Sequence, residues 1–159
     1  MFTQGILISI PILGLIAGYV LQKVAPEEVK PGRPYFLIIQ RILMAIIVGL
    51  LLYISPWSWK TIAALFMGAV LGYVFRMRYL YLGLAIVSVL AMPQELLLLA
   101  AALVFLYGLP FGTHKITKKP IFSMITHIIL YGIPFLLLTT PFSLQYLPAV
   151  VAGALFLRE

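Results

Sequence analysis

Long apolar runs follow one another along almost the whole of this chain. Of its 159 residues, 64% are apolar and only 9% are charged, whereas soluble domains carry about 25% charged residues. A helix needs roughly 20 apolar residues to cross the hydrocarbon core of a bilayer. The sequence therefore predicts an all-α, polytopic integral membrane protein with a single transmembrane domain over residues 1–159.

Seven apolar segments are bounded by charged residues or by Pro and Gly clusters. They cover residues of about 5–22, 35–54, 61–75, 79–92, 96–111, 121–138 and 144–157. The third, fourth and seventh are short for a span, so we expect them to thin the bilayer, to snorkel their ends or to lie partly inside the bundle. The polar stretch 23–34 is expected to form a loop. Because segment 75–79 contains no Gly or Pro, one long helix over 61–92 is the competing interpretation.

Basic residues indicate how these segments are oriented. With seven spans and the N-terminus outside, nine Lys and Arg residues fall on the cytoplasmic side and Lys60 falls outside, as the positive-inside rule requires. The nine are Lys23, Lys30, Arg33, Arg76, Arg78, Lys115, Lys118, Lys119 and Arg158. The sequence thus predicts a multi-pass protein of the cell membrane with an external N-terminus and a cytoplasmic C-terminus. The net charge of +7 indicates topology rather than nucleic-acid binding.

Residues 33–53 resemble residues 119–139. Aligned without a gap, the two stretches are identical at eight of 21 positions. In the segments that follow, Gly68 aligns with Gly153. This similarity suggests an internal repeat.

The repeat predicts two triplets of helices, over about 5–75 and about 96–157, joined by a linker helix over about 79–92. Because the linker is a single helix, both triplets run in the same direction, and the arrangement is a parallel 3+1+3 bundle. The pair Gly14 and Gly18 has no clear counterpart in the second triplet.

This topology resembles that of the SWEET sugar facilitators and other PQ-loop proteins, which share the same orientation. The resemblance covers the architecture alone, because Pro93 and Gln94 lie at the outer end of the fifth helix. In that family the Pro-Gln pair belongs within the first helix of each triplet, so the chain is not assigned to it. Microbial rhodopsins also have seven helices, but segment 144–157 contains no Lys for a retinal Schiff base.

Two polar pairs occupy matching positions of the repeat. Gln40 and Arg41 align with Thr126 and His127 inside otherwise apolar segments. If the Arg41 side chain faces the bundle interior, it would bind a carboxylate or phosphate through two hydrogen bonds. Gln40, Thr126 and His127 would then be its hydrogen-bonding neighbours. In the alternative interpretation Arg41 snorkels to lipid headgroups, and His127 is a neutral side chain that bonds a neighbouring group.

Small residues and one proline suggest how the helices pack. The pairs Gly14 and Gly18, and Gly68 and Gly72, each place two small residues on one helix face, which allows close intramolecular packing or homodimerisation. Pro134 removes a backbone hydrogen bond within the sixth segment, so we expect a kink that would act as a hinge in a transporter.

A cluster of basic residues is expected at the cytoplasmic surface. It consists of Arg76, Arg78, Lys115, Lys118 and Lys119. The orientation of the helices in the membrane accounts for the position of these basic residues. Each would also attract anionic lipid headgroups or an acidic partner subunit.

The composition disfavours catalysis. The chain has no Cys and no Asp, and its four acids are Glu residues outside the apolar segments. We find no catalytic constellation, no metal cluster and no cofactor motif. The sequence therefore predicts a carrier for a small polar, anionic solute. The alternative is a non-catalytic subunit or assembly factor of a larger membrane complex, and an enzyme acting on lipid phosphates is the third hypothesis.

Overall fold

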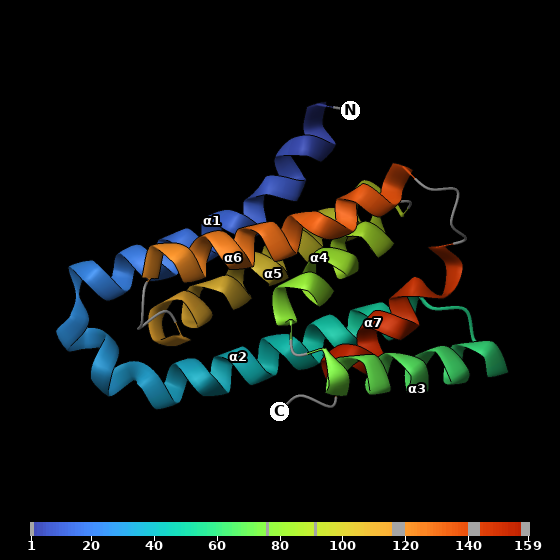
Figure 1. Ribbon diagram of the computed structural model, residues 1–159, viewed down its shortest axis with the longest axis horizontal. Coiled ribbons are helices and arrows are strands. Elements are labelled where there is room, and N and C mark those ends of the chain that lie inside the picture. Colours follow the sequence, from blue (N-terminus) through green and yellow to red (C-terminus); the bar gives the residue numbers. More distant parts are fainter. Residues whose placement is uncertain (1, 76, 91, 116–119, 140–143, 157–159) are drawn as a thin grey trace.

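The computed structural model describes residues 2–75, 77–90, 92–115, 120–139 and 144–156. In these ranges the chain forms seven α-helices and two 3-10 helices (Figure 1). The α-helices are α1 (Phe2–Val24), α2 (Pro26–Ile54), α3 (Trp59–Val74), α4 (Arg78–Val89), α5 (Gln94–Lys115), α6 (Pro120–Gly132) and α7 (Leu147–Phe156). The 3-10 helices are η1 (Ile133–Thr139), which continues α6, and η2 (Leu144–Tyr146), which precedes α7. The prediction of an all-α protein is confirmed.

Three helices contain apolar stretches that are long enough to cross a membrane. These stretches are Gly5–Val24 in α1, Pro31–Ile54 in α2 and Gln94–Thr113 in α5. Each reaches the roughly 20 residues that the hydrocarbon core requires. Length and composition therefore suit the chain to association with a membrane.

The short helices α4 and α7 form the centre of the bundle. Nine residues of α4 and seven of α7 are buried. The α4 helix packs against α5, α6, α7 and η1, while α7 packs against α2 and α3 as well. The expectation that short segments lie partly inside the bundle is confirmed for these two helices.

The α3 helix begins and ends at well-defined residues. The extended residue Ser58 precedes it, and the Ser58 Oγ accepts a hydrogen bond from the Thr61 N–H at 3.3 Å, as an N-cap does. At the other end the chain leaves the helical conformation at Phe75, and α4 begins at Arg78. The prediction of two separate helices is confirmed, and the single helix over 61–92 is wrong.

We expect the substitution Ser58→Ala to lower the free energy of unfolding by about 1 kcal/mol, because the first turn of α3 loses its side-chain acceptor. Thermal unfolding of the purified protein in detergent measures this loss. Ser9→Ala is the control, since the Ser9 hydroxyl is exposed and donates only to the Gly5 carbonyl within α1. An equal loss in both variants would contradict the capping role.

The predicted loop over 23–34 is wrong. The α2 helix begins at Pro26, so that only Ala25 separates it from α1. Proline is favourable at the first helical position because the N–H that it lacks has no partner there. Glu27 follows in the first turn, where a carboxylate interacts favourably with the helix dipole. The polar composition of this stretch therefore reflects an exposed helix start rather than a loop.

The ends of α5 and α6 also differ from the prediction. The α5 helix continues past Pro110 to Lys115, beyond the predicted end near residue 111. The sixth segment is not one α-helix, because it changes to a 3-10 helix at Ile133, directly before Pro134. Proline cannot donate the backbone hydrogen bond that an α-helix needs at this position.

The α1 and α5 helices cross through glycine residues. A Cβ atom on Gly18 would overlap the carbonyl oxygen of Leu109, and one on Gly112 would approach the carbonyl oxygen of Leu15. Gly14 likewise lies against Phe105, and because residue numbers rise together from this contact to that of Gly18 with Leu109, α1 and α5 run parallel (Figure 1). Small residues allow two helix backbones to approach this closely.

The α3 and α7 helices repeat this arrangement. A Cβ atom on Gly68 would overlap the carbonyl oxygen of Val150, and one on Gly153 would overlap that of Leu65. These contacts are reciprocal, because the alignment that matches Gly68 with Gly153 also matches Leu65 with Val150. Gly72 lies against Ala154, four residues beyond the contact of Gly68 with Val150 in both helices, so α3 and α7 also run parallel.

A hydrogen bond also links the sixth helix to the first. The hydroxyl of the fully buried Tyr131 donates to the carbonyl oxygen of Ile8 at 3.0 Å. We expect Tyr131→Phe to lower the free energy of unfolding by about 1 kcal/mol, because the aromatic ring stays in place and only this bond is lost. The measurement is thermal unfolding, with Tyr35→Phe on the exposed side of α2 as the control. An unchanged midpoint for Tyr131→Phe would show that this bond does not stabilise the fold.

Candidate functional site

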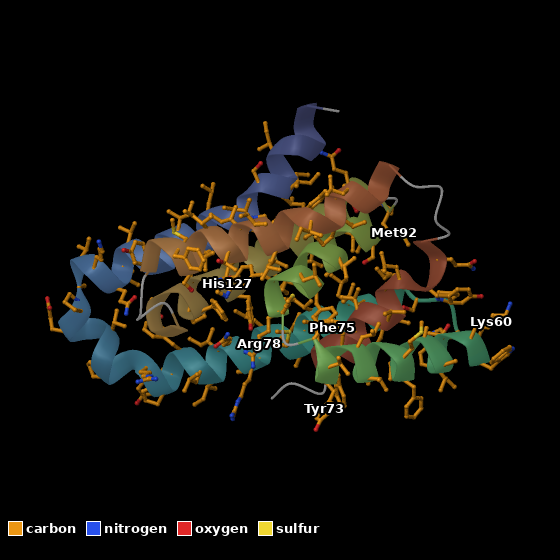
Figure 2. The ribbon with its side chains drawn as sticks, in the orientation of Figure 1. Lys60, Tyr73, Phe75, Arg78, Met92 and His127 are labelled. Atoms are coloured by element: carbon orange, nitrogen blue, oxygen red, sulfur yellow. The ribbon has the colours of Figure 1, made fainter. Side chains whose placement is uncertain are left out.

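A positively charged side chain reaches into the bundle from the start of α4. The Arg78 side chain is half-buried, and its Nη1 donates a hydrogen bond to the hydroxyl of Tyr107 on α5 at 3.3 Å. Tyr107 is fully buried. Figure 2 shows Arg78 near the middle of the long axis of the molecule, whereas Lys60 lies at one end. A permanent positive charge at this depth of an apolar bundle marks a candidate functional site.

Three aromatic rings form a cluster beside Tyr107. The rings of Tyr79, Phe111 and His127 contact one another edge to face, with centroids 5.0 to 5.2 Å apart. Phe111 also stacks on Tyr107, at 6.2 Å between centroids. The α4, α5 and α6 helices thus each supply a ring to one cluster, which we call the polar centre together with Arg78 and Tyr107.

Packing and one hydrogen bond fix the His127 ring. The Nδ1 atom lies 2.6 Å from the carbonyl oxygen of Ser123, one turn earlier in α6. A carbonyl oxygen only accepts, so Nδ1 carries the proton. The Nε2 atom then accepts a hydrogen bond while the ring is neutral and donates one when the ring is protonated.

Three buried polar atoms lack hydrogen-bond partners among the described residues. They are the hydroxyl of Tyr79, within the polar centre, the hydroxyl of Tyr19 on α1 and the amide nitrogen of Gln40 on α2. Gln40 lies on the face of α2 that also carries the buried residues Leu43 and Met44. Buried polar groups are normally hydrogen-bonded, so each of these atoms is an exception that needs an explanation.

The four predicted ligand residues do not come together in one site. Arg41 is exposed on the outer side of α2 rather than facing the bundle interior. Thr126 is also exposed, and its hydroxyl donates to the Phe122 carbonyl at 2.9 Å within α6. Only Gln40 is buried, and only His127 belongs to the polar centre. Solute binding by Arg41 and Thr126 therefore stays a prediction.

The predicted basic surface is described only in part. Arg76, Lys118 and Lys119 lie outside the described residues, and Lys115 is the last residue of α5. Arg78 differs from the expectation for a surface residue, because its side chain reaches the buried Tyr107.

The four predicted packing glycines and the predicted hinge proline each lie against another helix. Gly14 and Gly18 lie against the backbone of α5, and Gly68 and Gly72 lie against that of α7, within the same chain. Pro134 is buried beside Gly83 of α4 and follows the change from α-helix to 3-10 helix.

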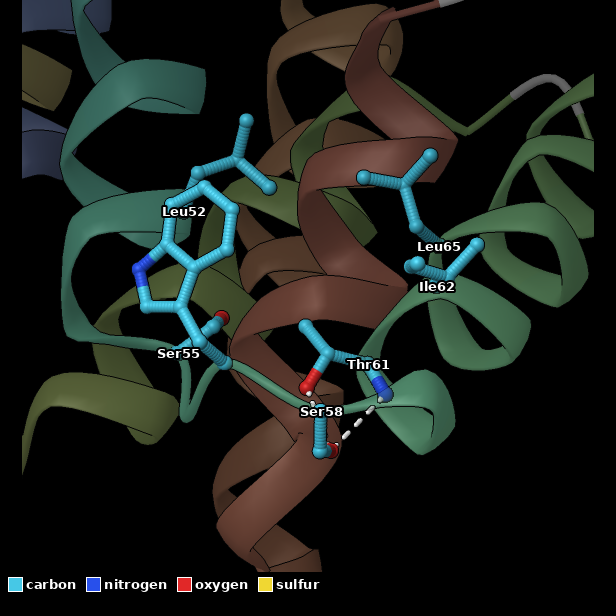
Figure 3. Close-up of a pocket in the computed structure, with 7 residues that line it drawn as sticks. Leu52, Ser55, Ser58, Thr61, Ile62 and Leu65 are labelled. Atoms are coloured by element: carbon cyan, nitrogen blue, oxygen red, sulfur yellow. Dashed lines mark hydrogen bonds between the residues drawn. The ribbon is translucent and has the colours of Figure 1, made fainter.

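Two hollows in the described part of the molecule lie away from the polar centre. The larger, of about 470 Å³, lies between the end of α2 and the start of α3 (Figure 3). The smaller, of about 150 Å³, lies between the middle of α2 and the end of α7. Among the described residues, no three His or acidic side chains are close enough together to hold a metal ion.

The sequence did not predict that Tyr107 and Phe111 belong to the polar centre. Tyr107 and Phe111 belong to a Tyr-Gly-Leu-Pro-Phe stretch that has a second copy from Tyr131 to Phe135, and this duplication was the available signal. The glycine pair of α1 does have a counterpart, because Gly108 and Gly112 have the same four-residue spacing in α5.

Comparison with known proteins does not assign this chain to a family. No protein-family model matches this chain, and neither a curated protein nor a solved structure does. The polar centre is therefore the basis on which a function is proposed.

Proposed function

We propose that the protein is a small membrane carrier for an anionic solute, and that Arg78 is the residue that binds the anion. The observation that carries this proposal is the position of Arg78, which is half-buried inside an apolar bundle and bonded to the hydroxyl of a fully buried Tyr107. The planar guanidinium group binds carboxylates and phosphates through paired hydrogen bonds. Ionisable groups at such depth usually mark the path of a solute.

The neighbours of Arg78 suit a small anion with additional polar groups. The Tyr79 hydroxyl is buried and has no partner among the described residues, so it is able to donate to an anionic oxygen. His127 offers its Nε2 atom as acceptor or donor, depending on its protonation.

Helix pairing supports a two-fold repeat of parallel triplets, with α4 as the linker. The reciprocal contacts of Gly68 with Val150 and of Gly153 with Leu65 are those that a pseudo-two-fold axis produces. Gly18 and Gly112 form a similar reciprocal pair between α1 and α5. In transporters built from repeats, the solute site lies near the middle of the membrane at the interface between the repeats.

The same pairing supports an orientation with the N-terminus outside and the C-terminus in the cytoplasm. Because α1 and α5 are parallel, Lys23 and Lys115 lie at the same end of the bundle. Lys60 lies at the other end (Figure 2). An excess of basic residues favours the cytoplasmic side, so this orientation agrees with the positions of these three lysines.

Ligand-dependent thermal stability tests the proposal. The purified protein is heated in the presence of small carboxylates, inorganic phosphate and phosphate esters, and the same panel is applied to Arg78→Ala and Arg41→Ala. A solute that binds the folded state raises the unfolding midpoint. We expect at least one anion to stabilise the wild type and Arg41→Ala, but not Arg78→Ala. Equal stabilisation of all three proteins, or none of the wild type, would contradict the role of Arg78.

One observation favours the second candidate function, a non-catalytic subunit of a larger membrane complex. Arg41 is a charged residue on an exposed face of α2 that is otherwise apolar, with Ile38, Ile42 and Ile46 nearby on the same helix. An acidic residue of a partner helix would compensate this charge within the membrane. Co-purification of a partner that is lost in Arg41→Ala would support this function.

A further inference from the structure

The first turns of α1 bend away from the rest of that helix. Figure 1 shows them leaving the bundle at an angle, while the remainder of α1 lies along α5. Pro11 lies inside α1, where it has no N–H to bond the carbonyl of Leu7 and its ring crowds that carbonyl. A proline inside a helix is a usual cause of such a kink. Pro11 therefore divides α1 into a first segment over residues 2–10 and a second segment over residues 12–24.

The two segments of α1 differ in how firmly they are held. In the second segment, Gly14 and Gly18 lie directly against the backbone of α5. In the first segment, Leu7 is the one buried side chain among residues 5–10, and no atom lies near the position of a Cβ on Gly5. A segment with few packing contacts opens at a low free-energy cost. The second segment is thus fixed on the bundle, whereas packing holds the first segment only weakly.

A hydrogen bond ties the first segment to α6. The hydroxyl of Tyr131 donates to the carbonyl oxygen of Ile8 at 3.0 Å. Tyr131 is itself held firmly, because its ring packs against Phe135 with centroids 5.6 Å apart and its carbonyl oxygen lies against Gly83 of α4. A fixed donor therefore holds a weakly packed segment in place.

This hydrogen bond lies on the outer side of the polar centre. The ring of Tyr79 contacts that of His127, and Gly83 lies against Tyr131, so both helices advance by four residues from one contact to the next. The α4 and α6 helices thus run parallel here, and Tyr131 lies one helical turn, about 6 Å, beyond the polar centre. In the proposed orientation α6 runs towards the outside, so this turn is the outer one.

We infer that the first segment of α1 is a gate on the outer side of the polar centre, with Pro11 as its hinge and the hydrogen bond from Tyr131 to Ile8 as its latch. The gate is closed while this bond is made. When the bond breaks, the segment turns about Pro11 and uncovers the outer side of the polar centre. The inference rests on the proposed carrier function, in which a solute has to reach Arg78 from outside.

Distances between spin labels test the hinge and the latch. The chain has no cysteine, so labels are attached at Ile6→Cys in the first segment and at Ile129→Cys on α6, both at exposed positions. We expect mainly one distance in the otherwise unchanged protein. Tyr131→Phe should raise the ratio of a second distance to the first about five-fold, the effect of losing one neutral hydrogen bond. Adding Pro11→Ala should remove the second distance, because an uninterrupted helix has no hinge.

Leu21→Cys replaces Ile6→Cys in the control pair. Leu21 is exposed in the second segment of α1, so its distance to the label at Ile129→Cys should be the same with and without Tyr131→Phe. An unchanged distribution for the Ile6 pair in Tyr131→Phe would overturn the latch. A second distance that persists with Pro11→Ala would overturn the hinge, and a change in the Leu21 pair would show that α1 moves as a whole, which overturns the gate.

Modification of a cysteine in the polar centre tests whether the gate leads to the candidate site. His127→Cys is treated with a membrane-impermeant maleimide outside reconstituted vesicles, with and without Tyr131→Phe. We expect the modification to be about five-fold faster with Tyr131→Phe, and an equal rate would overturn the gate. Neither readout uses an anion. Failure of the gate therefore leaves the anion-binding test of Arg78 unaffected, and failure of that test leaves the spin-label distances and the modification rates unaffected.

Discussion

Gly68→Leu is expected to lower the free energy of unfolding by at least about 3 kcal/mol, or to prevent the protein from folding. A Cβ atom at this position would overlap the carbonyl oxygen of Val150 in α7. The overlapping atom belongs to the backbone, so no side chain is able to move aside. The α3 and α7 helices would have to separate, and α7 also lies against α2 and α4.

Gly49→Leu is the matched control for this effect. Gly49 lies in α2, is exposed, and has no atom near the position of an added Cβ. The substitution should be neutral or stabilise the helix by up to about 1 kcal/mol, because Leu has a higher helix propensity than Gly. Size-exclusion profiles and unfolding midpoints in detergent compare the two variants. Equal midpoints would show that α3 and α7 do not cross through Gly68.

Arg78→Gln is expected to weaken anion binding by about 10- to 150-fold, the range for hydrogen bonds to a charged group. The amide side chain keeps some hydrogen-bonding capacity but removes the positive charge. Arg78→Lys should lie between the wild type and Arg78→Gln, because an ammonium group keeps the charge but loses the planar pair of donors. Calorimetric titration with the most stabilising anion of the thermal panel measures these affinities.

Tyr107→Phe helps to separate positioning from direct contact. This substitution removes the hydroxyl that accepts a hydrogen bond from Arg78. The guanidinium group keeps its charge but is less well oriented. We expect a decrease in affinity of about five-fold, as for one neutral hydrogen bond. Arg41→Ala should keep the wild-type affinity because Arg41 is exposed on α2. A greater loss in Arg41→Ala than in Arg78→Gln would reverse the assignment.

Local sequence patterns predicted the helices well but their partners poorly. Apolar runs and their bounding residues indicated seven helices, and the break near Phe75 followed from the charges around it. The stretch 23–34 was misjudged, since an exposed helix start has the same polar residues as a loop. Glycine spacing identified faces that pack closely, but not which helix each face contacts. That choice depends on the shape of two surfaces together.

The candidate site was harder to predict for a physical reason. A basic residue at the edge of an apolar segment usually reports the orientation of a helix in the membrane, and Arg78 fitted that pattern. Its approach to Tyr107 depends on how α4 sits against α5, which is a tertiary contact between residues 29 positions apart. Conversely, Arg41 stood deep in its apolar segment but lies on an exposed helix face.

Anion exchange in reconstituted vesicles tests the central claim most directly. Vesicles preloaded with the anion that gives the largest thermal shift are mixed with the same labelled anion outside, and its uptake is followed for wild type, Arg78→Gln, Arg41→Ala and protein-free vesicles. A carrier with its binding site at Arg78 predicts fast uptake by the wild type and Arg41→Ala, and uptake by Arg78→Gln at the protein-free rate. Uptake by the wild type at the protein-free rate would contradict the carrier function, and undiminished uptake by Arg78→Gln would contradict the site.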